Sequence, residues 1–327
     1  MITRGFAGIP LWSYAVGLVI VGLLLTAPVS YALARARWTR RAPRPALVLW
    51  QAVCLAAGFS VVAGLVLLAV EPLGSTMLGA AWAWFAALFS GTLQLPLWRL
   101  VCGLVAATIT VVLLAVLGRT AALTVHRRRA HRQVLDVLTR PTVRSGVGGR
   151  LRASQELRIL DHGAAIAYTL PGWHSRVVLS AGLVALLTEA ELSAVIEHER
   201  AHLRARHDLL VLPFQAWAVA LGWVPGVRPA GASVAELTEM LADDVAAART
   251  SRAALASALA KVALSGPAPA RPDRLADAPA IAATAVTDRV RRLLHPHPLS
   301  GWATVAVTAV SVLLLAIPAS VLLLRWS

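Results

Sequence analysis

The sequence predicts an α-helical membrane protein with about four transmembrane helices and an α+β domain between the third and fourth of them. Hydrophobic residues make up 58% of the 327 residues and charged residues only 14%. An ordinary soluble domain carries about 25% charged residues. The apolar residues also gather in four runs, and each run is long enough to cross roughly 30 Å of hydrocarbon as a helix.

The four apolar runs divide the chain into three parts. The runs occupy residues 11–34, 46–70, 97–118 and 299–324. They predict a three-span membrane domain at 1–118, a domain at 119–298 and a fourth transmembrane helix within 299–327. A shorter apolar stretch at 77–89 contains Trp82, Trp84 and Phe85. It is either a further span or an interfacial or re-entrant helix with an aromatic anchor, and the arginine distribution favours the second.

Arginines orient the spans. They follow the first and third spans in two clusters: Arg35, Arg37, Arg40, Arg41 and Arg44, then Arg119, Arg127, Arg128, Arg129 and Arg132. Between the second and third spans the charged residues are Glu71 and, at the edge, Arg99. Because arginine-rich short loops stay in the cytoplasm, we expect an integral plasma-membrane protein whose 119–298 domain is cytoplasmic.

Two other interpretations of the basic character are disfavoured. The net charge of +15 could indicate nucleic-acid binding, but no helix-turn-helix or zinc-finger spacing supports direct contact with nucleic acid. The arginine clusters are better explained by contact with the anionic lipid bilayer. Ala32-Leu33-Ala34 resembles a signal-peptide cleavage site, yet the arginines that follow it resist translocation.

In the 119–298 domain the residue pattern predicts first a helix and then three strands. We expect a basic helix at 119–138, a glycine-rich turn at 145–149, strands at 157–160, 165–170 and 176–180, and a turn at 171–174. A helix at 189–210 follows, and Thr188 with Glu191 forms a capping box at its start. Residues 209–221 fit either a core helix or a membrane-dipping helix.

The helix at 189–210 carries the motif HExxH, as His198-Glu199-Arg200-Ala201-His202. Residues four apart lie on one face of a helix, so His198 and His202 can bind one metal ion. Glu199 can then reach the water that the metal polarises, which is the chemistry of a zinc peptidase. The alternative is two surface histidines, but the capping box and the apolar stripe of Leu192 and Ile196 weigh against it.

A catalytic Zn²⁺ needs a third protein ligand. His207 lies half a turn away on a continuous helix, so we expect it to face elsewhere. Asp208 would require a helix-breaking glycine three residues earlier, which this sequence lacks. Of two downstream acids we favour Glu239 over Glu236, which we expect at the surface. Asp243 follows Glu239 by four residues and can fix the orientation of a ligand histidine.

The sequence resembles the BlaR/MecR-type integral-membrane zinc metallopeptidases in three segments. These are His198–Asp208, the hydrophobic stretch ending Trp223-Val224-Pro225, and Glu239-Met240-Leu241-Ala242-Asp243. These metallopeptidases are gluzincins with HExxH and a downstream ExxAD, and the three-plus-one order of spans is also similar. The resemblance covers nearly the whole chain. One departure is Ala242, where antirepressor members often carry cysteine, and it leaves the ligands intact.

This resemblance implies a cytoplasmic gluzincin-type zinc endopeptidase domain. His198, His202 and Glu239 would be zinc ligands, Glu199 the general base, and Asp243 the partner of a ligand histidine. It implies a protein substrate, such as a cytoplasmic transcriptional repressor in signal transduction. The beta-lactam receptors of this type carry an extracellular sensor after the fourth span, whereas this sequence stops at Ser327, so direct acylation by a beta-lactam is not expected.

Other functions remain open from the sequence. HtpX-like membrane quality-control proteases share the HExxH and ExxAD pair. A non-catalytic membrane receptor with a structural zinc site belongs to another class, and the absence of cysteine from the ligand set disfavours it. The strand at 165–170 is either a substrate-binding edge strand or a plain hairpin strand. We expect Arg289 to be a solvated juxtamembrane charge rather than part of the site, and we leave a homo-oligomer open.

Overall fold

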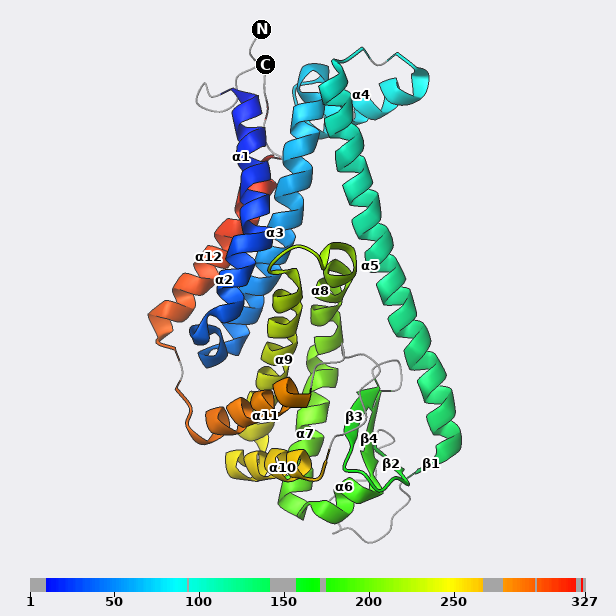
Figure 1. Cartoon of the computed structure of the whole chain (residues 1–327), viewed down its shortest axis with the longest axis vertical. Helices are drawn as coiled ribbons and strands as arrows, with labels where there is room; N and C mark the ends of the chain where they lie inside the picture. The colour runs from blue at the N-terminus through cyan, green and yellow to red at the C-terminus, as the bar shows by residue number, and fades with distance from the viewer. Residues whose placement is uncertain are drawn as a thin grey trace. The chain divides into compact units, whose positions relative to one another are not determined.

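A computed structural model describes residues 10–92, 94–141, 157–170, 175–266, 279–297, 299–321 and 325. The chain is mostly helical and divides into two compact units (Figure 1). The first unit contains Met1–Arg119, Leu212–Val234 and Leu299–Ser327, and the second contains Thr120–Val211 and Ala235–Pro298. Three helices, α5, α8 and α9, have residues in both units.

The first unit contains the membrane-spanning helices. Four helical stretches are long and apolar enough to cross a bilayer: Leu11–Arg35, Pro43–Leu73, Leu97–Arg127 and Gly301–Ser320. They belong to α1 (Leu11–Leu24) with α2 (Ser30–Arg35), to α3 (Pro43–Val70), to α5 (Leu97–Leu138) and to α12 (Gly301–Ser320). The four predicted spans are confirmed, and the protein is a multi-pass membrane protein. The predicted basic helix at 119–138 is the continuation of α5 rather than a separate helix.

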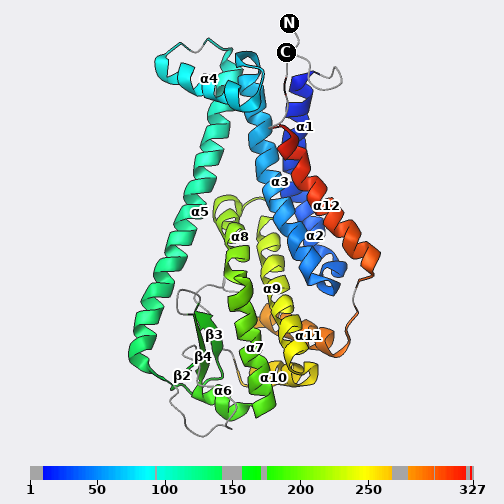
Figure 2. The ribbon, with the colours of Figure 1, turned by 180° about the vertical axis from the view of Figure 1, so that it is seen from behind.

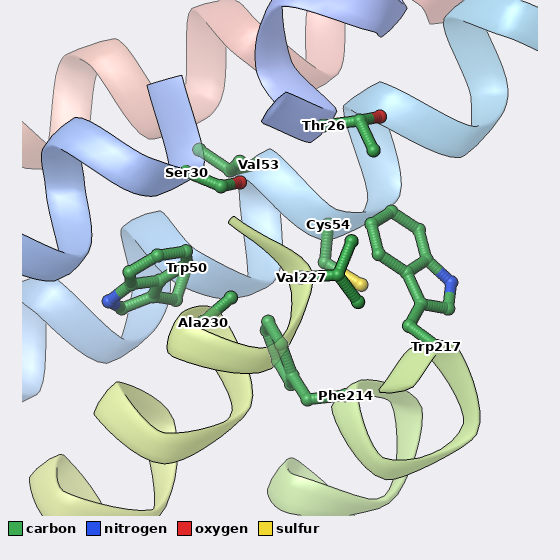
Figure 3. A pocket seen from close by; sticks show the side chains of 9 residues that line it. All are labelled: Thr26, Ser30, Trp50, Val53, Cys54, Phe214, Trp217, Val227 and Ala230. Carbon is green, nitrogen blue, oxygen red and sulfur yellow. The ribbon is translucent and has the colours of Figure 1, made fainter. Parts of the chain in front are cut away.

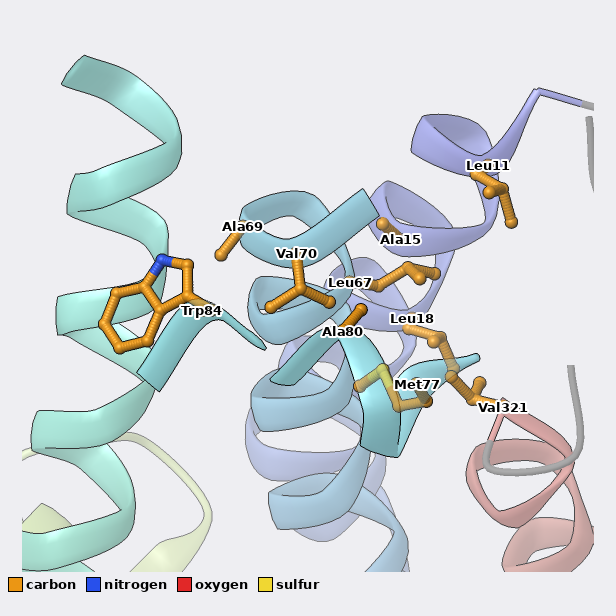
Figure 4. Close-up of a cluster of buried hydrophobic side chains, with 10 residues drawn as sticks. All are labelled: Leu11, Ala15, Leu18, Leu67, Ala69, Val70, Met77, Ala80, Trp84 and Val321. Carbon is orange, nitrogen blue, oxygen red and sulfur yellow. The ribbon is translucent and has the colours of Figure 1, made fainter. Parts of the chain in front are cut away.

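Close backbone packing joins α1 to α3. A Cβ at Gly22 would lie 2.9 Å from the carbonyl oxygen of Ala57, and a Cβ at Gly64 would lie 2.6 Å from that of Ala15. Small residues allow this approach, which is how helices associate in lipid. Figure 4 shows side chains of α1 and α3 meeting those of α4 in one buried cluster, which includes Leu18, Leu67 and Val70. Helix α3 also packs against α12.

Helix α4 (Met77–Ser90) forms the short apolar stretch between the second and third spans. Its 14 residues extend about 21 Å, too short to cross the hydrocarbon. Met77, Ala80 and Trp84 are buried, whereas Trp82 and Phe89 are 72% and 76% exposed. One apolar face therefore packs on the protein and the other is open, as expected for an interfacial helix rather than a further span.

The turn between α8 (His207–Leu221) and α9 (Val227–Arg249) packs against the first span. The first span has a π-helical turn at Leu25–Val29, where Ser30 Oγ donates a hydrogen bond to the carbonyl of Leu25. Gly226 has a φ of 98°, and a Cβ there would lie 2.7 Å from the carbonyl oxygen of Ala27. Only glycine fits this conformation and this approach.

Side chains of the α8–α9 hairpin also enclose a small cavity with the π-helical turn, α2 and α3. Figure 3 shows Phe214 and Trp217 facing Trp50 and Cys54 across it. The cavity has a volume of about 10 Å³, room for no more than one water molecule. Residues 212–234 thus belong to the unit that contains the long apolar helices.

The second unit contains a four-stranded sheet. The strands are β1 (Thr139–Pro141), β2 (Leu157–Leu160), β3 (Ala167–Leu170) and β4 (Arg176–Ser180), in the order β1-β2-β4-β3. Strands β2 and β4 are parallel and the other two pairs are antiparallel. The three predicted strands are confirmed, β3 beginning two residues later than expected, and β1 was not predicted. The predicted turns at 145–149 and 171–174 lie outside the described residues.

Four further helices complete the second unit: α6 (Ala181–Leu186), α7 (Glu189–Ala205), α10 (Arg252–Leu264) and α11 (Pro279–Leu294). Val177 and Leu179 of β4 form a core with Leu192 and Ile196 of α7 and Ala258 of α10. Helix α7 contacts β3 as well as β4, and both views show it beside these strands (Figure 2). The core therefore holds the HExxH helix next to the terminal strand β3.

The predicted capping box fixes the start of α7. The Thr188 N–H donates to Glu191 Oε2 at 2.8 Å, and the Glu191 N–H donates to Thr188 Oγ1 at 3.4 Å. The carboxylate of Glu191 also accepts hydrogen bonds from Ser257 and Lys261 of α10. Lys261 and Ser257 together lower the pKa of Glu191 to about 2. The same acid therefore caps α7 and attaches it to α10.

Candidate metal centre

The two histidines of HExxH converge with an acid from α9. His198 and His202 lie one turn apart on α7, and their Nε2 atoms are 3.2 Å apart. Glu239 Oε2 lies 3.6 Å from Nε2 of His198, and Glu239 Oε1 lies 3.6 Å from Nε2 of His202. The possible metal-binding atoms of these three residues all lie within 4.8 Å of one another. Among the described residues, they are the group of metal-binding side chains that meets this distance.

The spacing of these ligand atoms fits a zinc ion. Ligands bonded to zinc at 2.0–2.1 Å in a tetrahedron lie about 3.3 Å from one another. The measured separations of 3.2 and 3.6 Å are close to this value. Two imidazoles and a carboxylate, without cysteine, are the donor set of catalytic zinc sites, which keep their fourth position for water or substrate.

Asp243 stands behind His198, one turn beyond Glu239 on α9. Its Oδ1 lies 3.0 Å from Nδ1 of His198, and its side chain is 1% exposed. A carboxylate at Nδ1 orients the ring so that Nε2 faces the metal. The sequence placed Glu239 and Asp243 on one helical face, and the structure brings both to the HExxH histidines.

Arg289 of α11 completes the buried ionic cluster. It donates two hydrogen bonds to Asp243, from Nε and Nη2, each at 2.7 Å, and its Nη1 lies 3.1 Å from Glu239 Oε2. The expectation that Arg289 is a solvated juxtamembrane charge is wrong, since the residue is only 9% exposed. Leu293, four residues later, is fully buried on the same face of α11. In the sequence, this spacing of four residues from an apolar leucine could have indicated that Arg289 faces inward.

The charges in this cluster shift one another's protonation. Burial alone would raise the pKa of Asp243, but Arg289 lowers it to about 2. Burial would lower the pKa of His198, but Asp243 and Glu239 raise it to about 9. Asp243 and Glu239 likewise raise the pKa of Arg289 against the effect of burial. Without a metal, His198 therefore carries a proton between two carboxylates, where a bound cation would replace it.

Glu199 and Glu236 are also inside the protein. Glu199, between the two histidines on α7, is only 2% exposed, and its charge is felt by Arg289. The formal charges of Glu199, Glu239 and Asp243 exceed that of Arg289 by two, which a divalent cation would balance. Glu236 is half-buried, with Oε1 inaccessible to solvent. As expected from the sequence, Glu236 does not join the metal group.

His207 is close to the centre, contrary to the expectation that it faces elsewhere. Its Nδ1 lies 3.0 Å from Nδ1 of His202, and it is 2% exposed. Helix α7 ends at Ala205, and Arg206 has the left-handed conformation, with φ and ψ of 47°. The predicted continuous helix to residue 210 is therefore wrong. The break redirects the chain so that His207, the first residue of α8, faces back towards His202, and its burial lowers its pKa.

Comparison with known proteins identifies one protein family that matches part of the chain. Residues 150–303 match the model described as Peptidase family M48. No curated protein and no solved structure matches the chain. The matched segment begins before β2 and ends within α12, and it includes every residue of the metal centre. The domain between the third and fourth long apolar helices is thus the part of the chain with a recognised family.

The first prediction concerns the third ligand. We expect the purified protein to bind about one zinc ion per chain. Glu239→Ala should weaken zinc binding by more than the roughly 10–100-fold that loss of an outer hydrogen-bond partner costs. Metal analysis after dialysis, followed by competition with a chelator, measures both quantities.

Glu236→Ala is the matched control, because it removes an identical side chain three residues away on α9. It should bind zinc like the wild type. Loss of zinc from Glu236→Ala or Asp208→Ala, with full retention in Glu239→Ala, would show that the third ligand is misassigned.

The second prediction concerns pH. Zinc must displace the proton that His198 holds up to its pKa of about 9. Zinc affinity should therefore rise by about tenfold per pH unit between roughly pH 6 and pH 9, one proton being released per zinc bound. Calorimetry in buffers of different ionisation enthalpy counts the protons released. Asp243→Asn should reduce this release near pH 8, and an affinity that is flat across the range would contradict the assignment.

Proposed function

We propose that this protein, a membrane zinc metallopeptidase with a domain of the M48 type, cleaves a cytoplasmic protein such as a transcriptional repressor and thereby transmits a signal. The matched domain is that of a metallopeptidase, which hydrolyses peptide bonds, and its metal site consists of His198, His202 and Glu239. The observation that supports the catalytic assignment is the meeting of these three ligands beside the buried acid Glu199.

Glu199 is the proposed general base. Bound zinc supplies a Lewis acid that polarises water and the substrate carbonyl. Glu199, adjacent to His198 on α7, takes a proton from the attacking water and returns it to the leaving amine. His198, His202 and Glu239 would hold the ion, and Asp243 orients the ring of His198. Arg289 keeps Asp243 ionised and in place through its two hydrogen bonds.

The substrate is proposed to bind as an added strand along β3. Strand β3 is terminal in the described sheet, pairing with β4 on one side, and it contacts α7, which carries Glu199. An extended peptide on a sheet edge gains backbone hydrogen bonds, whatever its sequence. It would then present alternate carbonyl groups on the side away from β3.

A cytoplasmic position for the domain is supported by the arginines. Arg35, Arg37, Arg40 and Arg41 follow the first span, and Arg127 and Arg129 follow the third. Clusters of this kind remain in the cytoplasm and contact anionic lipid. The order of three spans, peptidase domain and fourth span, with HExxH and ExxAD, resembles the BlaR/MecR type, and this resemblance is what favours a repressor as substrate.

A second candidate is an HtpX-like protease that removes damaged membrane proteins. The observation in its favour is that α8 and α9 both continue into the unit of membrane helices. His207 and Glu239 lie on these two helices, so the site is built on elements that also pack within the membrane unit. A comparison of cleaved cellular proteins between wild type and Glu199→Gln separates the candidates: one regulator supports signalling, and many misfolded membrane proteins support quality control.

The third prediction tests the general base. Glu199→Gln keeps the size of the side chain but cannot accept the proton from water. It should reduce the rate of peptide hydrolysis by about a hundredfold to ten-thousandfold. Zinc content should stay at the wild-type level, because all three ligands remain. Cleavage by Glu199→Gln at the wild-type rate would falsify the proposed mechanism.

The fourth prediction tests the side of the membrane. Ser265 follows α10 in the peptidase unit, and Ser75 lies between the second and third spans; both are exposed. In a background of Cys54→Ala and Cys102→Ala, Ser75→Cys should react with a membrane-impermeant maleimide on intact cells. Ser265→Cys should react only after the membrane is opened. The opposite pattern would exclude a cytoplasmic substrate.

A further inference from the structure

His207 is a buried histidine that the proposed mechanism leaves without a role. Its ring centroid lies 4.8 Å from that of His202, and the two rings are nearly perpendicular, at 88°. The contact joins the two Nδ1 atoms, 3.0 Å apart. Among the described residues, Nε2 of His207 has no hydrogen-bond partner. The contact with His202 is therefore the polar contact that orients the His207 ring.

The backbone places His207 in this position by an unfavourable conformation. Arg206 is the non-glycine residue with positive φ in the described part of the chain, and the left-handed region is disfavoured for a residue with a Cβ. The turn is held by hydrogen bonds from the Arg206 N–H to the carbonyl of Leu203 and from the Leu209 N–H to the carbonyl of Arg206. Strained residues of this kind gather at functional sites.

The geometry of His202 decides which atom of the pair donates. Nε2 of His202 faces Nε2 of His198 and Oε1 of Glu239, so it is the ligand atom and must carry no proton. A neutral imidazole has one proton, which must then be on Nδ1. Nδ1 of His202 therefore donates, and Nδ1 of His207 accepts. His207 in turn carries its own proton on Nε2.

We propose that His207 is a positioning residue that fixes the orientation and tautomer of the zinc ligand His202, as Asp243 does for His198. This inference rests on the proposed metal site. The two ligand histidines are then supported differently, His198 by a carboxylate and His202 by a neutral ring. A neutral partner orients the ligand without adding a further negative charge to a cluster that already holds Glu199, Glu239 and Asp243.

Zinc affinity tests this role directly, with the metal alone as the probe. His207→Phe keeps a buried ring but removes the acceptor, and it should weaken zinc binding by about 10–100-fold, the usual effect of losing an outer partner of a ligand histidine. His207→Asn should restore affinity to near the wild-type level, because its Oδ1 lies where Nδ1 of histidine lies. His207→Gln should not, since its oxygen corresponds to Nε2. Full-length protein in detergent, competed with a chelator, gives the affinities.

A second measurement separates positioning from folding. The visible spectrum of the Co²⁺-substituted protein reports ligand geometry, and it should change in His207→Phe and His207→Gln but not in His207→Asn. If the phenylalanine variant fails to fold, the asparagine and glutamine variants decide the question by themselves. Equal zinc affinity in those two, or wild-type affinity in a folded His207→Phe, overturns the inference. Failure of the wild type to bind zinc would instead overturn the proposed function.

Discussion

The buried ionic cluster of Arg289, Asp243, Glu239 and His198 is the interaction on which the rest of the site depends. Each of these groups would be costly to bury alone, so each is stable only while its partners are in place. The four side chains come from α7, α9 and α11, and the same contacts therefore fix three helices relative to one another. With Glu199 included and His198 neutral, the formal charges sum to minus two, which a divalent cation would balance.

Helices α8 and α9 connect this cluster to the membrane unit. Their connecting turn packs against the π-helical turn of the first span, where Gly226 approaches the carbonyl of Ala27. His207 at the start of α8 and Glu239 near the middle of α9 contact the HExxH histidines. Residues that pack among the spans and residues that form the metal centre therefore both occur on α8 and on α9.

The centre combines a common ligand set with unequal support for its two histidines. His198 is backed by a carboxylate that Arg289 keeps ionised, whereas His202 is backed by His207, whose burial favours the neutral form. An anionic partner makes a ligand imidazole a stronger donor, and a neutral partner mainly orients it. In this way the site can hold zinc firmly without accumulating further buried negative charge.

The features that depend on local spacing could be predicted from the sequence. The four spans follow from length and hydropathy, the capping box of α7 from residues three apart, and the pairing of His198 with His202 from residues four apart on one helix. The ExxAD spacing also indicated Glu239 over Glu236. Tertiary structure alone decided the position of Arg289, because its partner Asp243 is 46 residues away in the sequence. The tertiary structure also decided the position of His207. Helical periodicity assumes an unbroken helix, but the left-handed residue Arg206 ends α7, so the residues after it face a different direction from the predicted one.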